Sequence, residues 1–215
     1  MPPSQMNKKI RAVIFDMDGV LIDAKEWHYE ALNRALGLFE FHINRYEHLV
    51  TFDGLPTRDK LAMLTKDRGL PLGLHDVINN LKQKYTMEIV HRECKPMFQH
   101  EYALSKLKAR GYKLALASNS VRNSVEVMMK KSGLDRFLDA MVSNEDVKKG
   151  KPDPEMYLKA TDLLGLDPAE CLVVEDNENG IRAARDAGCH VMVVRDVLDV
   201  TDENISRELA TLQNS

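Results

Sequence analysis

The sequence predicts an α/β protein with a doubly wound, Rossmann-like parallel-sheet core that carries a small inserted α-helical domain. Two observations favour this fold class. Short apolar runs alternate with amphipathic stretches along most of the chain, a pattern typical of parallel strands covered by helices on both faces. One long region near the start shows helical patterns alone, which indicates an insert in the core.

The core elements follow in order along the chain. Apolar runs predict strands at residues 9–15, 113–117, 140–142, 172–174 and 190–194. Amphipathic segments predict helices at residues 101–110, 122–131, 154–164 and 179–187. A glycine closely follows each of these helical segments, as expected at a helix C-terminus. Asp153 before Pro154 predicts an N-cap followed by a proline in the first turn.

The insert lies between the first strand's loop and the second strand. Helical patterns occur there at residues 26–38, 45–50, 58–69 and 74–91, without a convincing buried strand. The core is therefore expected to be discontinuous, built from residues 1–25 and 93–215, with the inserted helical domain at residues 26–92.

Composition limits the possible classes of partner. The 215 residues include 30 Lys and Arg against 33 Asp and Glu, a net charge of −3 that argues against a nucleic-acid partner. No apolar stretch approaches the roughly 20 residues that span a bilayer, and the first ten residues lack a signal-peptide core. Three cysteines without C-x-x-C spacing predict buried free thiols. We expect a cytoplasmic protein that does not bind membranes and is a monomer by default.

Polar residues follow the ends of several predicted strands. In open α/β sheets, ligands bind beyond the carboxyl ends of the strands, so these loops are expected to meet at one edge. The residues concerned are Asp16 and Asp18, Ser118 and Asn119, Lys151, and Glu175 with Asp176.

These residue types together suit a phosphoryl group. Close carboxylates such as Asp16 and Asp18 repel each other unless a cation or a shared proton is present. Hard carboxylate oxygens favour Mg²⁺ over zinc. Lys151 would supply a positive charge and Ser118 a hydroxyl donor, which completes a site for a metal-assisted phosphoryl reaction.

The ordered motifs resemble those of the haloacid dehalogenase-like phosphohydrolases. Asp16-Met17-Asp18-Gly19-Val20 matches the first motif, and Ser118 the second. Lys151, within Gly150-Lys151-Pro152-Asp153-Pro154, and the Glu175-Asp176 pair match the remaining two. The insert resembles the α-helical cap of the subgroup that contains β-phosphoglucomutase and phosphoglycolate phosphatase.

The resemblance implies a role for each matching residue. Asp16 would attack phosphorus and form an aspartyl-phosphate, while Asp18 would serve as acid and base. Mg²⁺ would be held by the Asp16 carboxylate, the Asp18 carbonyl and Asp176, with Glu175 as a further ligand or a neighbour of the ligands. The second aspartate, Asp18, favours phosphoryl transfer over cleavage of a carbon–halogen bond, because dehalogenases lack it.

The phosphate-binding residues complete this assignment. Lys151, Ser118 and the backbone N–H of Asn119 would hold the phosphoryl oxygens. Gly19 would allow the tight turn beneath the phosphate.

Residues of the cap are candidates for substrate binding. His28 matches a histidine that β-phosphoglucomutase-like enzymes place near the acid/base aspartate; otherwise it is a polar helix residue. The stretch from Asp53 to Arg58 resembles the cap loop that contacts substrate. Asp53 and Thr57 occupy the places of a lysine and an arginine in the mutase, with Arg58 one position further on, and this departure weakens the mutase interpretation.

The sequence thus predicts a Mg²⁺-dependent phosphatase that acts on a small phosphorylated metabolite, with a sugar phosphate as the expected substrate. The alternatives are a sugar phosphomutase of the same fold and a phosphate-ligand binding protein without turnover. Neither G-x-G-x-x-G nor G-x-x-x-x-G-K-[ST] occurs, which disfavours a nucleotide-binding enzyme of those types.

Overall fold

The computed structural model describes residues 9–52 and 55–213 of the chain. The chain divides into two compact units. The first comprises Met1–Ile22 and Pro96–Ser215, and the second comprises Asp23–Lys95. The first unit is therefore assembled from two separate stretches of sequence.

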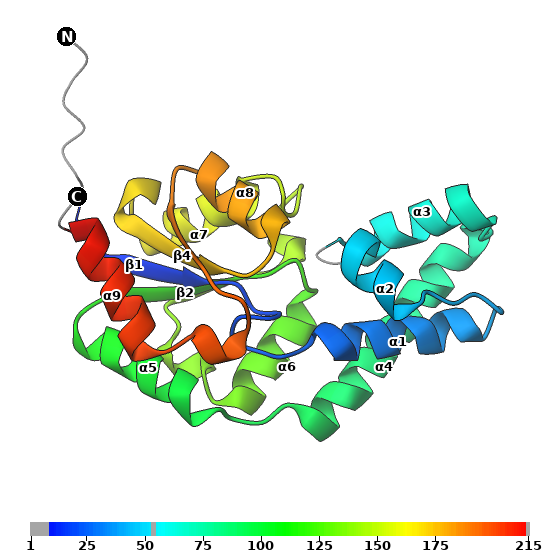
Figure 1. Cartoon of the computed structure of the whole chain (residues 1–215), viewed down its shortest axis with the longest axis horizontal. Helices are drawn as coiled ribbons and strands as arrows, with labels where there is room; N and C mark the ends of the chain where they lie inside the picture. Colours follow the sequence, from blue (N-terminus) through cyan, green and yellow to red (C-terminus); the bar gives the residue numbers. More distant parts are fainter. Residues whose placement is uncertain (1–8, 53–54, 214–215) are drawn as a thin grey trace, which may run out of the picture. The chain divides into compact units, whose positions relative to one another are not determined.

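A five-stranded sheet forms the centre of the first unit (Figure 1). Its strands are β1 (Ala12–Phe15), β2 (Lys113–Ala117), β3 (Ala140–Val142), β4 (Cys171–Glu175) and β5 (His190–Val193). They are parallel and lie in the order β3-β2-β1-β4-β5. The predicted α/β fold class is confirmed, although the first strand begins at Ala12 rather than at residue 9.

Helices cover both faces of this sheet. They are α5 (Phe98–Ala109), α6 (Arg122–Ser132), α7 (Glu155–Leu164), α8 (Glu178–Asp186) and α9 (Asp202–Gln213). Helices α7 and α8 lie on one face, and α5 and α9 lie on the other (Figure 1). Short 3₁₀ turns occupy the loops at Asp135–Phe137, Asn144–Asp146, Pro168–Glu170 and Val197–Asp199.

Helix boundaries largely follow the expected signals. Gly133 and Gly165 end α6 and α7 in the left-handed conformation, with φ of 71° and 64°. Helix α7 begins at Glu155 with Pro154 at its N-cap, so the predicted N-cap at Asp153 is wrong by one residue, although the Asp153 carboxylate accepts the Glu155 N–H at 3.1 Å. Helix α9, which packs against α5, was not predicted from the sequence.

The core of the first unit is densely apolar. Strands β1 and β4 are buried along their whole length, as expected for central parallel strands. Alternate residues of β1, such as Ala12 and Ile14, pack with one face of α7 that includes Met156 and Tyr157. Packing of this face fixes α7 against the sheet and turns the Tyr157 side chain inward.

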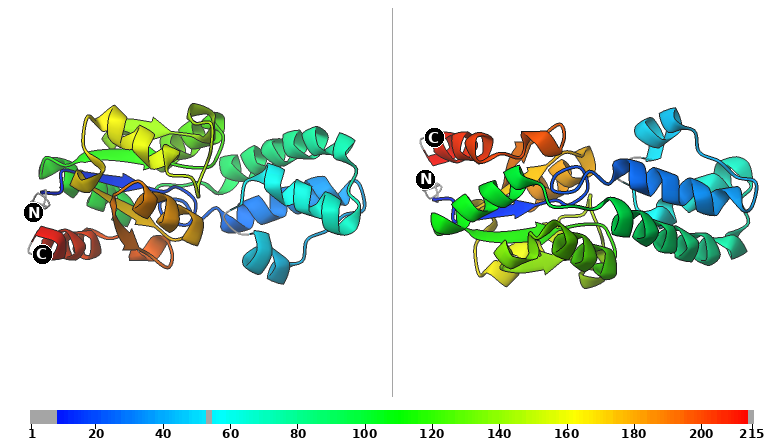
Figure 2. Two further views of the ribbon diagram at one scale, coloured as in Figure 1. Left: turned by 90° about the horizontal axis from the view of Figure 1, so that it is seen from above. Right: turned by 90° about the horizontal axis from the view of Figure 1, so that it is seen from below.

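The second unit is helical throughout its described part. Its elements are α1 (Lys25–Gly37), α2 (Arg45–Glu47), a π-helical segment (His48–Phe52), α3 (Thr57–Arg68), a 3₁₀ turn (Leu72–Leu74) and α4 (His75–Glu93). Figure 2 shows α1 and α4 side by side. The expected helix at residues 45–50 instead widens into the π-helical segment at His48.

The three cysteines, Cys94, Cys171 and Cys189, are buried free thiols, as the sequence predicts. Burial raises the pKa of Cys171 and of Cys189 to about 12. Among the described residues, no helix combines the length and the apolar character that crossing a membrane requires.

Candidate active site

The register of the sheet brings the ends of three strands to one level. Phe15 of β1 pairs with Leu116 of β2 on one side and with Val174 of β4 on the other. The next residue, Asp16, donates its backbone N–H to the Val174 carbonyl at 3.0 Å. Asp16 therefore leaves the sheet beside Glu175, the last residue of β4.

Lys151 lies between these two carboxylates. Its Nζ is 2.5 Å from Asp16 Oδ1 and 2.6 Å from Glu175 Oε1. The ammonium group is buried and lies 4.8 Å from the centre of the Tyr157 ring. Burial alone would lower the pKa of Lys151, but the charges of Asp16 and Glu175 outweigh it and raise that pKa. Lys151 is thus a fixed cation at neutral pH.

Hydrogen bonds fill the carboxylate of Glu175. Oε1 accepts from Lys151 and from the Tyr157 hydroxyl, the latter at 2.7 Å. Oε2 accepts the backbone N–H groups of Asp176 and Asn177 at 3.0 and 3.2 Å. A carboxylate offers roughly four lone-pair positions, and these four donors occupy them. The Glu175 side chain is therefore held rigidly.

A glycine provides the space for this carboxylate. A Cβ atom on Gly180, in helix α8, would lie 1.7 Å from Glu175 Oε1, far inside van der Waals contact. The helix backbone therefore approaches Glu175 as closely as it does because residue 180 has no side chain.

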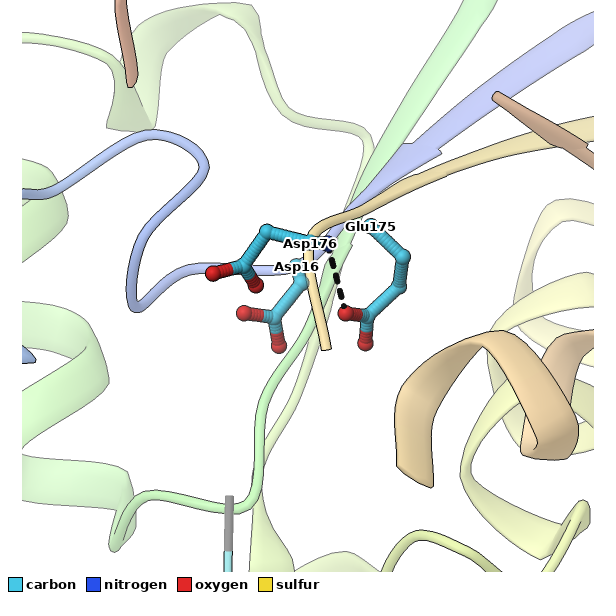
Figure 3. Close-up of side chains that lie close together, drawn as sticks. All are labelled: Asp16, Glu175 and Asp176. Atoms are coloured by element: carbon cyan, nitrogen blue, oxygen red, sulfur yellow. Dashed lines mark hydrogen bonds between the residues drawn. The ribbon is translucent and has the colours of Figure 1, made fainter. Parts of the chain in front are cut away.

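Three carboxylates gather at the ends of β1 and β4 (Figure 3). Oxygen atoms of Asp16, Glu175 and Asp176 all lie within 4.8 Å of one another. Burial raises the pKa of Asp16 well above its ordinary value, and Glu175, Asp18 and Asp176 add to the rise against the opposing charge of Lys151. The site thus carries more negative charge than one lysine offsets, which suits a divalent cation.

The loop after β1 makes the predicted tight turn. Gly19 adopts φ of 92°, and its N–H donates to the Ile22 carbonyl at 2.7 Å. Asp18, two residues after Asp16, accepts a hydrogen bond at Oδ2 from the Ser120 hydroxyl at 2.9 Å. The first-motif loop is thus joined to the loop after β2.

The loop after β2 also contacts the lysine-bearing loop. Asn119 Oδ1 accepts the Lys151 N–H at 2.9 Å, and Asn119 Nδ2 donates to the Lys151 carbonyl at 3.2 Å. Gly150 permits this contact, because a Cβ there would lie 2.5 Å from Asn119 Oδ1. Ser118 is buried at the end of β2, and its Oγ accepts the Ser120 N–H at 3.1 Å.

The remaining predicted residues belong to the helical unit. His28 lies on α1, with Nδ1 3.3 Å from the Lys82 ammonium on α4. Thr57 and Arg58 are the first two residues of α3, and the exposed Arg58 side chain lies 3.4 Å from Asp59. The predicted roles of His28, Thr57 and Arg58 toward substrate stay predictions. Asp53, which belongs to the same predicted loop, lies outside the described residues.

Three residues that support the site were not predicted from the sequence. Gly180 carried a signal, because a glycine inside a helical pattern often marks close backbone approach. Tyr157 falls on the apolar face of α7, so the pattern indicates burial but not its hydrogen bond to Glu175. Ser120 carried no signal beyond its place in a Ser-Asn-Ser turn.

Comparison with known proteins agrees with this arrangement. A family model described as "Haloacid dehalogenase-like hydrolase" matches residues 13–194. The chain is 33% identical over 187 residues to a phosphorylated carbohydrates phosphatase of Thermotoga maritima, covering 83% of this chain and 82% of the relative. It is 29% identical over 184 residues to the pyrophosphatase PpaX of Bacillus velezensis, covering 85% and 82% of the two chains.

Solved structures share the fold. The β-phosphoglucomutase of Clostridium difficile superposes with a TM-score of 0.82 at 21% identity, covering 96% of this chain and 100% of that chain. CbbY of Rhodobacter sphaeroides, solved in complex with phosphate, gives a TM-score of 0.77 at 24% identity, covering 86% and 85%. The sequence resemblance is confirmed: the chain belongs to the haloacid dehalogenase-like hydrolase family.

Proposed function

We propose that this protein is a Mg²⁺-dependent phosphatase that hydrolyses a small phosphorylated metabolite, with a sugar phosphate as the best candidate. The observation that carries the proposal is the contact of Lys151 with Asp16 inside a cluster of carboxylates. This arrangement pairs a nucleophile with a cation that neutralises phosphoryl charge. The relative named as a phosphorylated carbohydrates phosphatase supports the substrate class.

Asp16 and Asp18 divide the chemistry between them. A carboxylate oxygen of Asp16 attacks phosphorus, the bond from phosphorus to the substrate oxygen breaks, and an aspartyl-phosphate forms. Asp18 gives a proton to the departing oxygen and then takes one from the attacking water. The water oxygen bonds to phosphorus, the bond from phosphorus to the Asp16 oxygen breaks, and free phosphate and the Asp16 carboxylate result. Each proton that Asp18 gives in the first step is restored in the second.

Three groups of the core hold the transferred phosphoryl group. Lys151 offers its charge, Ser118 its hydroxyl and Asn119 its backbone N–H. The side chain of Asn119 is engaged with the Lys151 backbone, so it positions the lysine rather than contacting substrate.

The acidic cluster fits Mg²⁺. The Asp16 carboxylate, the Asp18 carbonyl and Asp176 would hold the ion. The carboxylate of Glu175 already accepts hydrogen bonds from Lys151, Tyr157 and the Asp176 N–H, so it would be a partner of Lys151 rather than a metal ligand. When bound, Mg²⁺ would offset phosphoryl charge and favour the ionised, nucleophilic form of Asp16, whose pKa is raised by burial and by its acidic neighbours.

The helical unit would select the substrate. It is inserted in the chain directly after the loop that carries Asp16 and Asp18, and loops or domains that close over such sites exclude water from the first step. Residues 1–25 with 93–215 would thus act as the catalytic core, and residues 26–92 as its cap.

The test is a phosphate-release screen of the full chain. Sugar phosphates, glycolate phosphate, pyrophosphate and nucleotides would be assayed with and without Mg²⁺, beside the Asp16→Asn variant. We expect release from the wild type with Mg²⁺ and none from the variant, while circular dichroism shows that the variant folds. Near-normal turnover by Asp16→Asn would refute the mechanism.

The same screen separates the alternatives. A phosphomutase would need a bisphosphate primer and would yield an isomeric sugar phosphate instead of free phosphate. A binding protein without turnover would release no phosphate from any compound of the screen, and none from 4-nitrophenyl phosphate.

A further inference from the structure

We propose that Ser120 is a positioning residue that orients the acid/base Asp18 toward the leaving oxygen of the substrate. The inference rests on the proposed function, since it concerns the proton that Asp18 delivers. The observation that supports it is the hydrogen bond from the Ser120 hydroxyl to Asp18 Oδ2 at 2.9 Å, between residues 102 positions apart in the sequence.

Ser120 is itself held by its backbone. Its N–H donates to Ser118 Oγ at 3.1 Å, and its carbonyl accepts the Asn144 N–H at 3.1 Å. Both contacts lie beyond the carboxyl ends of the neighbouring strands β2 and β3. The backbone of Ser120 is therefore held in place beyond the ends of these strands, and so is the start of the side chain whose hydroxyl bonds to Asp18.

This bond restrains the Asp18 side chain where position matters. The Asp18 backbone lies in the tight turn at Gly19, but that turn alone does not fix the rotation of the carboxyl group. The hydrogen bond from Ser120 to Oδ2 restricts this rotation relative to the strand ends. A general acid must lie within hydrogen-bond reach of its target, and a misplacement of about 1 Å costs on the order of 100-fold in rate.

Ser120 contacts Asp18 rather than Lys151 or Asp16, so its effect should follow the need for a proton. An alkoxide departing from a sugar phosphate is strongly basic and requires protonation as it leaves. 4-Nitrophenolate is a stable anion that leaves without it. Loss of the Ser120 hydroxyl should therefore slow the first substrate and spare the second.

The experiment compares kcat/KM for two substrates in the full-length protein with Mg²⁺. The substrates are 4-nitrophenyl phosphate and the alkyl phosphate that wild type hydrolyses fastest in the screen. The parameter kcat/KM reports the steps through departure of the alcohol, so the later attack of water on the aspartyl-phosphate does not enter it.

We expect Ser120→Ala to lower kcat/KM for the alkyl phosphate by about 10- to 100-fold and to change the value for 4-nitrophenyl phosphate by less than about threefold. Ser120→Thr keeps the hydroxyl, so its log(kcat/KM) for the alkyl phosphate should lie at least halfway from the Ser120→Ala value back to the wild-type value. Ser132→Ala, which removes a buried hydroxyl bonded to the Met129 carbonyl in α6, is the matched control and should alter neither substrate.

The Asp18→Asn background provides the second arm. Adding Ser120→Ala to Asp18→Asn should cause no further loss with the alkyl phosphate, because the residue that Ser120 positions is already inactive. Equal losses with both substrates, additive losses in the double variant, or an unchanged alkyl phosphate rate would each overturn the inference while leaving the phosphatase proposal intact. Wild type that releases no phosphate would instead overturn the proposed function.

Discussion

Replacing Gly180 by alanine adds one methyl group at the closest approach of a helix to the active-site network. The new Cβ would lie 1.7 Å from Glu175 Oε1 and 2.1 Å from its Cδ. Ordinary van der Waals contact begins at 3.4 Å, which is twice the 1.7 Å separation of the new Cβ from Oε1. The carboxylate oxygen must therefore move away by about another 1.7 Å. That movement breaks the contacts of Glu175 with Lys151 and Tyr157, now 2.6 and 2.7 Å long.

The cost follows from the burial of this network. Separating a buried ion pair costs about 3–5 kcal/mol, and Lys151 keeps Asp16 as a partner, so we expect the lower value of about 3 kcal/mol. In a protein of this size each kcal/mol lowers Tm by about 2–4 °C, which gives a fall of about 6–12 °C. Phosphatase activity should fall as well, because Lys151 loses the carboxylate that fixes its position.

The assay is thermal and urea unfolding of Gly180→Ala, with Gly37→Ala as the matched control. Gly37 ends helix α1, and a Cβ there would meet nothing within 4 Å, so the control should be neutral or slightly stabilising. In a Glu175→Ala background the added methyl should cost less than about 1 kcal/mol, because its obstacle is gone. Wild-type stability of Gly180→Ala, or an equal cost in both backgrounds, would contradict the reasoning.

Three further outcomes follow from the same structure. Tyr157→Phe removes a buried hydroxyl that Glu175 accepts, and should lower the free energy of unfolding by about 1–3 kcal/mol in urea titrations; no change would show that the bond is dispensable. The hydrogen bond from Arg122 holds the pKa of Asp146 at about 2, so this group stabilises the fold above its unfolded pKa of 3.8 and loses that effect as the pH falls toward 2. The stability difference between wild type and Asp146→Asn should thus be constant from pH 5 to 7 and shrink below about pH 4, and a difference that grows in acid would refute the assignment. Mg²⁺ should raise the Tm of wild type and not that of Asp176→Asn, as scanning calorimetry with Ca²⁺-free buffers and EDTA controls would report; equal shifts would exclude Asp176 as a ligand.

The sequence alone predicted the sheet well because its strands are short apolar runs closed by polar residues. The bounds of β2 and β3 agree with the expected ones. Asp16 and Glu175 come together as residues at neighbouring strand ends should, and the loop after β3 brings Lys151 between them. The π-helical segment at His48 was not predictable, because a helical pattern of residues does not specify whether the backbone widens.

The hydrogen bonds that support the site could not be predicted from sequence patterns for a different reason. Tyr157 and Glu175 are 18 positions apart, and Ser120 and Asp18 are 102 apart. Their hydrogen bonds depend on side-chain rotamers that packing selects after the strands have aligned. A motif names the residues at the strand ends, whereas the groups that orient them come from neighbouring loops and helices.

The paired hydrogen bonds between Asn119 and the Lys151 backbone have a consequence for how the lysine is carried. An amide side chain that accepts an N–H and donates to the C=O of one residue reproduces the contacts of a neighbouring strand. The Asn119 side chain therefore ties the loop after β2 directly to the backbone of Lys151. Lys151 lies in a turn rather than in a strand, yet both of its backbone polar groups are bonded to one side chain, and Gly150 leaves the room that this contact requires.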